Sequence, residues 1–489
     1  MLVALIAVGA ALLWLLLFSG FSWRARLLAV LALLSLVALS GALFQLHGFS
    51  GDLRPQFRWR FARRAALDPS SVPAGEIGDR TKQVSPRIPP ERDDARDFPQ
   101  FLGPTRNGVC PWEDFALDCN WVEHPPAEIW RVATGAGWSG FAVVGHTAVT
   151  QEQRGEIECV VCRDLLSGAT LWVHEDRAAY RSAVAGDGPR ATPSIADGVV
   201  YTVGSTGLLN ALDLATGRSL WSHDIVAENH ADVPEWGLST SPLVVLDRVV
   251  VCAGGEQGAA LVAYDARSGE KRWSSGSDKA GYSSPALLDL CGAMQIVNFS
   301  HSAASGHLPE NGQVLWTVPW SRKQPNVAQP LRVGENSIVL SSGYGVGASC
   351  LEIVVDANGR FSTRERWRSV RLKAKMSNMV TKEGCIYGFD DGALVCVDAG
   401  SGERQWKGER LGHGQMLLAG EMLLVQSEDG ELLLVAAGPT EYRELARHRL
   451  FDGKLWNPPA LAGGILLSRT DSQAVALKLP TLRSGERNR

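Results

Sequence analysis

One short phrase recurs along the chain and constrains its fold more than any other feature. The phrase reads Asp-x-x-Ser/Thr-Gly-x-x-x-Trp, and its four full copies end at Trp172, Trp221, Trp273 and Trp406. A fifth copy, LPENGQVLW, has Leu308 in place of the aspartate, and a sixth is stretched from Asp356 to Trp367. Repetition at a fixed period is typical of stacked copies of one supersecondary unit, because a single copy cannot bury its apolar face. The sequence therefore predicts a repeat architecture.

The residues of the phrase predict the unit that is repeated. Each copy follows an apolar, alternating run, such as VVYTVGSTGLLNAL before Asp213, which is typical of paired strands joined by a glycine-rich turn. The aspartate is expected to accept hydrogen bonds from its own turn, and the glycine to supply a positive φ. The tryptophan is expected to pack between adjacent sheets. Each unit is thus predicted to be a small antiparallel sheet.

The spacing of the tryptophans predicts the number of units. The six at 172, 221, 273, 316, 367 and 406 are 49, 52, 43, 51 and 39 residues apart, and a four-stranded propeller blade needs roughly 40–50 residues. A seventh blade without this tryptophan is predicted from about Gly414 to Phe451. The last stretch, 456–479, supplies only three strands, and the segment AEIWRV around Trp130 supplies the missing fourth.

We therefore expect an all-β fold over residues 98–480, an eight-bladed β-propeller with four-stranded antiparallel blades. The ring is predicted to close through the N-terminal strand near Trp130, which also removes exposed sheet edges. Seven blades remain the competing count. The net charge is −4, and no basic run lies within the propeller, so nucleic acid is not expected as a partner.

The first fifty residues have a different composition. Residues 2–18 are uninterrupted apolar and residues 27–46 are nearly so, and each run is about long enough to cross a bilayer as a helix. We expect a transmembrane helical hairpin within residues 1–50, rather than a signal peptide, because the first run has no basic n-region. Residues 51–97, rich in proline and charge, are predicted to be a linker, and residues 481–489 a disordered tail.

A central funnel is the predicted binding site. Residues at the start of each innermost strand face the axis of a propeller, and here they are polar or aromatic and vary between blades. The candidate ligand-binding residues are Trp138, Arg190, Trp236, Tyr282, Lys375, Asn378, His413 and Trp456. A concave mouth with a few convergent polar groups is the default hypothesis for a ligand site. We expect a small ligand or a protein partner there.

The chemistry of these residues narrows the hypothesis. Arg190 and Lys375 are expected to hold a carboxylate or another anion, and Trp236 or Trp456 to stack on a flat ring. The alternative for each single residue is a structural role. Pairs such as Thr192-Pro193 and Ser241-Pro242 form turns before strands without any ligand, and polar side chains of a funnel also bind water or backbone.

The cysteines do not predict a metal or redox site. Cys159 and Cys162 are spaced as a metal pair would be, but the repeats place Ala211, Ala263 and Cys396 at positions equivalent to Cys162. A small apolar residue is needed there, so these cysteines are predicted to be packing thiols. Nine scattered cysteines do not form a disulfide framework.

These repeats resemble the pyrroloquinoline-quinone-like, quinoprotein-type repeat of quinoprotein alcohol dehydrogenases and of the outer-membrane assembly lipoprotein propeller. The resemblance covers about Phe98 to Leu479. Finer segments resemble a membrane-tethered bacterial subgroup of these propellers, namely FPQFLGPTRNGV, GDGPRATP, YSSPA, GHGQML and WNPPALAGG.

The resemblance and the charges disagree on the side of the membrane. The resemblance to exported relatives implies a bacterial inner (cell) membrane protein with two helices and a periplasmic propeller. The positive-inside rule points the other way, because five arginines follow the second apolar run, at 54, 58, 60, 63 and 64. We expect the periplasmic orientation.

The resemblance also leaves two functions open. Quinoprotein dehydrogenases of this family typically carry a vicinal Cys-Cys disulfide, a catalytic aspartate and a calcium set of Glu, Asn and Asp. This sequence has no Cys-Cys pair and no segment that matches the calcium set. We expect a non-enzymatic binding scaffold without a cofactor, a catalytic residue or a metal site. The alternative is an alcohol dehydrogenase-type oxidoreductase with pyrroloquinoline quinone and calcium in the funnel.

Overall fold

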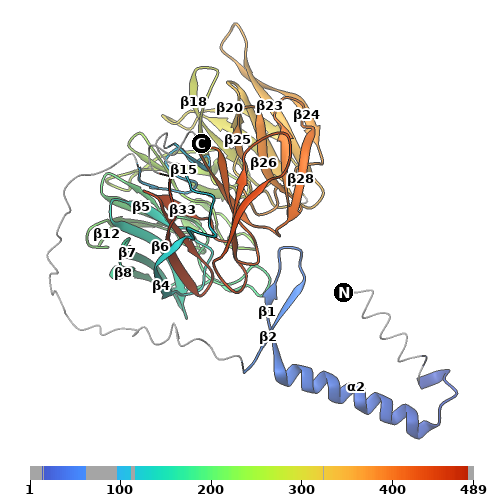
Figure 1. Cartoon of the computed structure of the whole chain (residues 1–489). Helices are drawn as coiled ribbons and strands as arrows, with labels where there is room; N and C mark the ends of the chain where they lie inside the picture. The colour runs from blue at the N-terminus through green and yellow to red at the C-terminus, as the bar shows by residue number, and fades with distance from the viewer. Residues whose placement is uncertain (1–13, 15, 62–95, 112–115, 323, 483–489) are drawn as a thin grey trace. The chain divides into compact units, whose positions relative to one another are not determined.

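The computed structural model describes residues 14, 16–61, 96–111, 116–322 and 324–482. The chain divides into two compact units, residues 1–66 and 67–489, and each is described by itself (Figure 1).

The described part of the first unit is a helix followed by a hairpin. Helix α2 (Trp23–Leu43) is long and apolar enough to cross a membrane, and none of its residues is buried. It begins after Ser22, whose hydroxyl accepts a hydrogen bond from Ala25 N. Strands β1 (Phe44–Phe49) and β2 (Pro55–Trp59) pair in antiparallel fashion.

This unit corrects two predictions. The described residues contain one apolar helix where a helical hairpin was predicted, and most of the first predicted span, 2–18, lies outside them. The second span ends at Leu43 and not at 46, because Phe44 pairs with Trp59 and packs edge-on against it at 5.1 Å. The first part of the predicted linker is therefore a strand, and residues 62–95 lie outside the described residues. Most of the predicted tail, 483–489, also lies outside them.

The second unit is a set of small antiparallel sheets, numbered here in chain order. Sheet 1 contains β5 (Ala142–Val144), β6 (Thr147–Arg154), β7 (Ile157–Asp164) and β8 (Thr170–Asp176). Sheet 2 contains β9 (Ser194–Ala196), β10 (Val199–Val203), β11 (Leu208–Asp213) and β12 (Ser219–Asp224). The short helix η3 (Ala227–Asn229) follows. Sheet 3 contains β13 (Leu243–Val245), β14 (Arg248–Gly255), β15 (Ala259–Asp265) and β16 (Lys271–Ser275).

The next three sheets repeat this order. Sheet 4 contains β17 (Ala286–Leu290), β18 (Ala293–Phe299), β19 (Ala303–His307) and β20 (Val314–Pro319). Sheet 5 contains β21 (Leu331–Val333), β22 (Ser337–Ser342), β23 (Gly347–Val355) and β24 (Phe361–Ser369). Sheet 6 contains β25 (Val380–Lys382), β26 (Cys385–Asp390), β27 (Ala393–Asp398) and β28 (Arg404–Arg410).

The last two sheets each take one strand from the N-terminal side. Sheet 7 contains β29 (Gln415–Ala419), β30 (Met422–Gln426), β31 (Glu431–Ala436), β32 (Glu444–Arg449) and the added β3 (Val109–Cys110). Sheet 8 contains β33 (Ala460–Ala462), β34 (Ile465–Arg469), β35 (Gln473–Lys478) and β4 (Ala127–Ala133).

The ring closes through its two ends. Strand β4 pairs with β35, with Trp130 opposite Ala476, so the predicted pairing of this N-terminal strand with the C-terminal strands is confirmed. Strand β33 contacts β5, which brings sheet 8 beside sheet 1 (Figure 1). The first strands of other neighbouring sheets also touch, as β9 does both β5 and β13. The described residues therefore form a β-propeller, with the apolar core between neighbouring sheets.

The recurrent phrase connects neighbouring sheets, because the tryptophan of one sheet packs on the glycine turn of the next. In the turn after β11, Asp213 Oδ1 accepts hydrogen bonds from Thr216 N at 2.9 Å and from the Thr216 hydroxyl. Gly217 has φ +70°, and a Cβ there would lie 2.5 Å from the ring of Trp172 on the preceding sheet. The Trp172 indole also donates to Leu214 O at 2.8 Å. The predicted role of the tryptophans in packing sheet against sheet is confirmed.

The same stacking of tryptophan on glycine occurs at five junctions. The pairs are Trp130 on Gly168, Trp172 on Gly217, Trp221 on Gly269, Trp273 on Gly312 and Trp367 on Gly402. Trp316 differs, because its indole donates to Gln295 Oε1 within its own sheet. A Cβ on Gly359, in the turn of the stretched sixth copy, would meet nothing within 4 Å. The stretched copy is thus the turn that receives no tryptophan.

One segment contacts the first strands of several sheets, and the sequence analysis did not predict its position. We call residues 97–110 the strap. Phe98 bridges Val143 of β5, and Pro99 O accepts from Ile195 N of β9. Further along, Arg106 contacts sheets 3 and 5, and β3 pairs in parallel with β29 of sheet 7. The strap therefore ties together sheets that are distant in the sequence.

His307, in β19, predicts a pH dependence of stability. Its imidazole is fully buried, and burial lowers its pKa to about 4, although a hydrogen bond to Gly312 O opposes this. Between pH 6.5 and 4 the unfolded chain binds a proton that the folded chain excludes. Stability should therefore fall as pH falls through this window, by roughly 3 kcal/mol.

The measurement is urea denaturation at a series of pH values. The variant His307→Gln should flatten the dependence on pH below 6.5, while His146→Gln, at an exposed histidine, should leave it unchanged. An identical slope in His307→Gln and in the natural chain would show that this imidazole is not responsible.

Candidate functional site

The predicted site residues precede the first strands of the sheets, where the chain returns to the axis. We call the surface formed by Trp138, Arg190, Trp236, Tyr282, Lys375 and Trp456, with the residues that contact them, the mouth. Its members come from loops before β5, β9, β13, β17, β25 and β33.

Two tryptophans and a lysine form one side of the mouth. The rings of Trp138 and Trp456 lie 5.0 Å apart. Lys454 Nζ lies 3.9 Å from the centre of the Trp456 ring and 4.7 Å from that of Trp138. Burial lowers the pKa of Lys454, and the charge of Arg190 lowers it further, while Asp471 and Glu428 raise it. The sequence pattern did not identify Lys454.

Arg190 is held beside this group. Its guanidinium donates to Gly188 O at 2.5 Å and to Gly186 O at 2.7 Å, and it stacks on Tyr180 at 4.6 Å. Ala185 O accepts from both Arg190, at 3.2 Å, and the Trp138 indole, at 2.8 Å. Burial lowers the pKa of Arg190 to about 10, so it remains a cation at neutral pH.

Glu428 connects His413 to the tryptophan group. Its carboxylate accepts from His413 N at 3.0 Å and from the Trp456 indole at 3.1 Å. The imidazole of His413 is 1% exposed, so this predicted site residue lies beneath the surface of the mouth. Glu428 was also not identified from the sequence.

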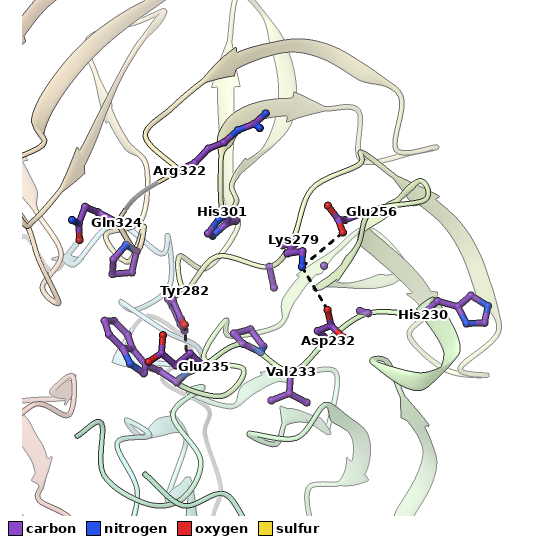
Figure 2. A pocket seen from close by; sticks show the side chains of 16 residues that line it. His230, Asp232, Val233, Glu235, Glu256, Lys279, Tyr282, His301, Arg322 and Gln324 are labelled. Atoms are coloured by element: carbon purple, nitrogen blue, oxygen red, sulfur yellow. Dashed lines mark hydrogen bonds and ion pairs between the residues drawn. The ribbon is translucent and has the colours of Figure 1, made fainter. Parts of the chain in front are cut away.

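On the other side of the mouth, Trp236 and Tyr282 line a cavity of about 360 Å³ (Figure 2). Their rings lie 5.2 Å apart, and Tyr282 Oη accepts from Trp236 N at 3.3 Å. Figure 2 shows Lys279 between two acids, with its Nζ 3.6 Å from Asp232 and 3.9 Å from Glu256. The other ionisable side chains of the lining are His230, Glu235, Tyr282, His301 and Arg322.

Lys375 is the remaining predicted cation. Its Nζ lies 4.3 Å from the centre of the Tyr344 ring. Burial raises the pKa of Tyr344 to about 12, with smaller contributions from Tyr282 and Glu235, two residues of the cavity lining. The mouth thus pairs Arg190, Lys375 and Lys454 each with an aromatic face, a favourable arrangement for a partly desolvated cation.

Asn378 lies among polar groups that form hydrogen bonds between neighbouring sheets. Its Oδ1 accepts from Gln329 N at 2.9 Å. Similar bonds occur around the ring, from Asn457 to Ser139 O, Gly140 to Thr192, Thr192 to Ser241, Ser241 to Ser284, Tyr282 to Asn326 O, and Gln415 to Met376 O and Trp456 O. These bonds join neighbouring sheets, which is the structural role that the sequence left as the alternative, and Asn378 also lines a second cavity, of about 420 Å³.

Cys162 and Cys396 are buried packing residues, as predicted. All nine cysteines are free. Cys162 is fully buried in an apolar cluster between sheets 1 and 2. Burial raises the pKa of Cys159 and of Cys162 to about 12, which disfavours the thiolate that metal binding and redox chemistry need.

The donor set for a calcium ion was tested against the described residues. Within them, no three His, Cys, Asp or Glu side chains are grouped as metal ligands would be. The carboxylate of Glu428, beside Trp456, accepts hydrogen bonds from a backbone N–H and an indole. The described residues thus contain no grouped set of side-chain donors for a calcium ion.

A family profile described as outer membrane protein assembly factor BamB matches residues 158–408, which is 251 of the 489 residues. The chain belongs to this family. The matched residues run from sheet 1 to sheet 6, so the BamB-type, pyrroloquinoline-quinone-like repeat predicted from the tryptophan phrase is confirmed.

Solved structures show the same fold at low identity. BamB from Moraxella catarrhalis has a TM-score of 0.54 at 17% identity, over 72% of this chain and 98% of the other. Quinohemoprotein alcohol dehydrogenase from Comamonas testosteroni has a TM-score of 0.56 at 13% identity, over 79% of this chain and 81% of the other. This likeness establishes the propeller fold alone.

Curated relatives are similar over shorter stretches. Quinoprotein alcohol dehydrogenase PedH of Pseudomonas putida is 31% identical over 146 residues, which are 27% of this chain and 23% of that protein. Quinohemoprotein alcohol dehydrogenase ADH-IIG of the same species is 30% identical over 249 residues, 45% of this chain and 32% of that protein. The chain thus spans at most about a third of the length of these relatives.

Proposed function

We propose that this protein is a membrane-tethered, non-enzymatic scaffold whose mouth binds an anionic ligand or an acidic segment of a protein partner. The single observation that carries the proposal is that three cations of the mouth, Arg190, Lys375 and Lys454, each lie against an aromatic ring. A carboxylate beside such cations makes charge-assisted hydrogen bonds. The rings offer flat apolar area next to them.

The architecture of the proposed scaffold follows the same reasoning. Sheets 1 to 8 are taken as eight blades, and the apolar N-terminal region as a tether in the bacterial inner membrane with the propeller in the periplasm. The apolar length of α2 and the BamB-type fold support this placement. A reporter enzyme that is active only in the periplasm, fused to the C-terminus, should be active. Activity only of a cytoplasmic reporter would contradict it.

Mouth variants test the binding proposal. The full chain in detergent should bind an acidic peptide that contains one aromatic residue, and should not bind the same peptide with lysine in place of glutamate. Lys454→Gln and Lys375→Gln should each weaken binding about 10-fold, because each removes a charge-assisted contact. Isothermal titration calorimetry measures both effects.

Lys407→Gln is the matched control, because Lys407 lies on β28, the outermost strand of sheet 6, and is exposed. Its affinity for the peptide should equal that of the natural chain. Equal binding of the acidic and basic peptides, or an equal loss in the control, would contradict the proposal.

The second candidate function is a quinone-dependent alcohol oxidoreductase. The similarity to PedH and ADH-IIG favours it. The lack of grouped calcium donors among the described residues does not. The test is to incubate the full chain with pyrroloquinoline quinone and calcium, remove unbound quinone, and measure retained absorbance and dye-linked alcohol oxidation. The scaffold proposal predicts neither, and stoichiometric retention with turnover would replace it with the enzyme.

A further inference from the structure

A second cavity, of about 420 Å³, lies beside the strap. Its walls come from strap residues 102 and 105–107 and from the first strands of sheets 4, 5 and 6 with the residues next to them. The mouth residues lie before these strands begin. Leu288, Asp289, Arg332 and Thr381 lie further along the strands, so this cavity is separate from the mouth. Its volume is within the range of small-molecule sites.

A buried cation forms part of its lining. Arg106 is 3% exposed. Its Nη1 donates to Pro242 O at 2.9 Å and to Gln100 Oε1 at 3.1 Å, and its Nη2 donates to Ser241 O at 3.2 Å. In the part of the chain that the structure describes, no carboxylate forms an ion pair with this guanidinium, and its Nε has no hydrogen-bond partner.

The unused N–H donors of Arg106 indicate the kind of ligand that the cavity can bind. A guanidinium has five N–H groups, and three of them are used here. The Nε–H and one hydrogen of Nη2 remain, and a guanidinium can bind a carboxylate in bidentate fashion through its Nε and Nη2 groups. A buried cation without a counter-charge is costly, and an anion bound at this edge would remove that cost.

The lining also contains apolar residues, among them Leu102, Leu288 and Met379, and polar side chains that are held in place by hydrogen bonds. Gln329 Nε2 donates to Arg106 O, and Gln329 Oε1 is buried without a hydrogen-bond partner among the described residues. The Thr105 hydroxyl bonds Asn107 Oδ1 at 2.8 Å. The other charged residues of the lining are Arg332 and Asp289, both exposed.

We propose that this cavity binds a small organic carboxylate, with the free edge of Arg106 as its bidentate donor and Arg332 as a second cation nearby. Arg106 supplies affinity for the anion, and Gln329 can accept a hydrogen bond from a hydroxyl or amide of the same molecule. Asp289 disfavours large polyanions. This site is independent of the function proposed for the mouth.

Titration of the full chain in detergent with succinate, and with neutral succinamide of the same shape, tests the proposal. Succinate should bind with one-to-one stoichiometry and succinamide should not bind. Arg332→Glu should weaken succinate binding about 10-fold, and Arg106→Lys, which keeps the charge but loses the forked edge, by about 10- to 100-fold. Arg218→Glu, at an exposed arginine in the turn before β12, is the matched control.

The controls separate this site from the mouth and from unfolding. Lys454→Gln should leave succinate binding unchanged. If Arg106→Lys does not fold, Arg332→Glu at the exposed position still decides the matter. Absence of saturable succinate binding to the natural chain, binding of succinamide equal to that of succinate, or binding unchanged by Arg332→Glu would each overturn the proposal.

Discussion

Replacing Arg469 by leucine is expected to lower the free energy of unfolding by roughly 3–5 kcal/mol. Arg469 is fully buried at the end of β34 in sheet 8. Its guanidinium donates to Gln151 O at 2.6 Å, to Thr150 Oγ1 at 2.9 Å and to Gly135 O at 2.9 Å. These acceptors belong to sheet 1 or the chain before it, so the side chain fastens the last sheet to the first. Leucine would leave them buried without donors.

The measurement is the shift in urea denaturation of the full chain. Arg449→Leu is the matched control, because Arg449 is about half exposed, pairs with Glu431 and Asp452, and donates to Asp429 O at the surface. It should change stability by less than about 1 kcal/mol. Burial lowers the pKa of Arg469 to about 10, so the charge persists at neutral pH. Equal losses in both variants would show that Arg469 does not fasten the ring.

Gly402→Ala should destabilise the propeller by roughly 3 kcal/mol. Gly402 has φ +73°, and a Cβ there would lie 2.5 Å from the Trp367 ring that covers it. The Trp367 indole is also fixed, by its hydrogen bond to Ala399 O at 2.8 Å. The substitution therefore combines backbone strain with a clash that the ring cannot easily relieve.

Gly359→Ala isolates the two effects. Gly359 has φ +74°, and a Cβ there would meet nothing within 4 Å, so only the backbone strain applies. Its expected cost is roughly 1 kcal/mol. Thermal denaturation of the two variants measures the difference. If both lose the same stability, the stacking of tryptophan on glycine does not contribute, and the physical reading of the repeat is wrong.

The repeat could be predicted from the sequence because its turn depends only on residues that are close together in the chain. The Asp-x-x-Ser/Thr-Gly turn needs a short-range acceptor and a positive φ, and both are set by residue type. The pairing of the Trp130 strand with β35 also followed, since the last repeat was one strand short. Both inferences needed only period and composition.

Other features depend on contacts that no local pattern encodes. The strap reaches from sheet 1 to sheet 7, and Arg106 meets Pro242 O across 136 positions. Lys454 was missed at the mouth because its stacking on Trp138 arises only when sheet 8 meets sheet 1. The end of α2 was misplaced because Phe44 is apolar enough for a helix and its pairing with Trp59 is not visible in composition.

The candidate site residues lie at different depths, and the sequence does not separate them for a similar reason. Positions before the first strands include a layer that faces the mouth and a layer that forms hydrogen bonds between neighbouring sheets. Asn378 belongs to the second layer and His413 lies beneath the first. Arg190 belongs to both layers. Its charge lowers the pKa of Lys454, and its guanidinium donates hydrogen bonds to three backbone carbonyls. Residue type alone does not separate these roles.

Site-specific photo-crosslinking in cells tests the central claim most directly. A benzophenone amino acid at Trp236, in the mouth, should give a defined adduct that weakens when Lys454→Gln is added. The same group at Leu220, exposed on the outermost strand β12, should give none. An adduct of equal yield from Leu220, or none from Trp236, would contradict the claim that the mouth of this propeller is its binding surface.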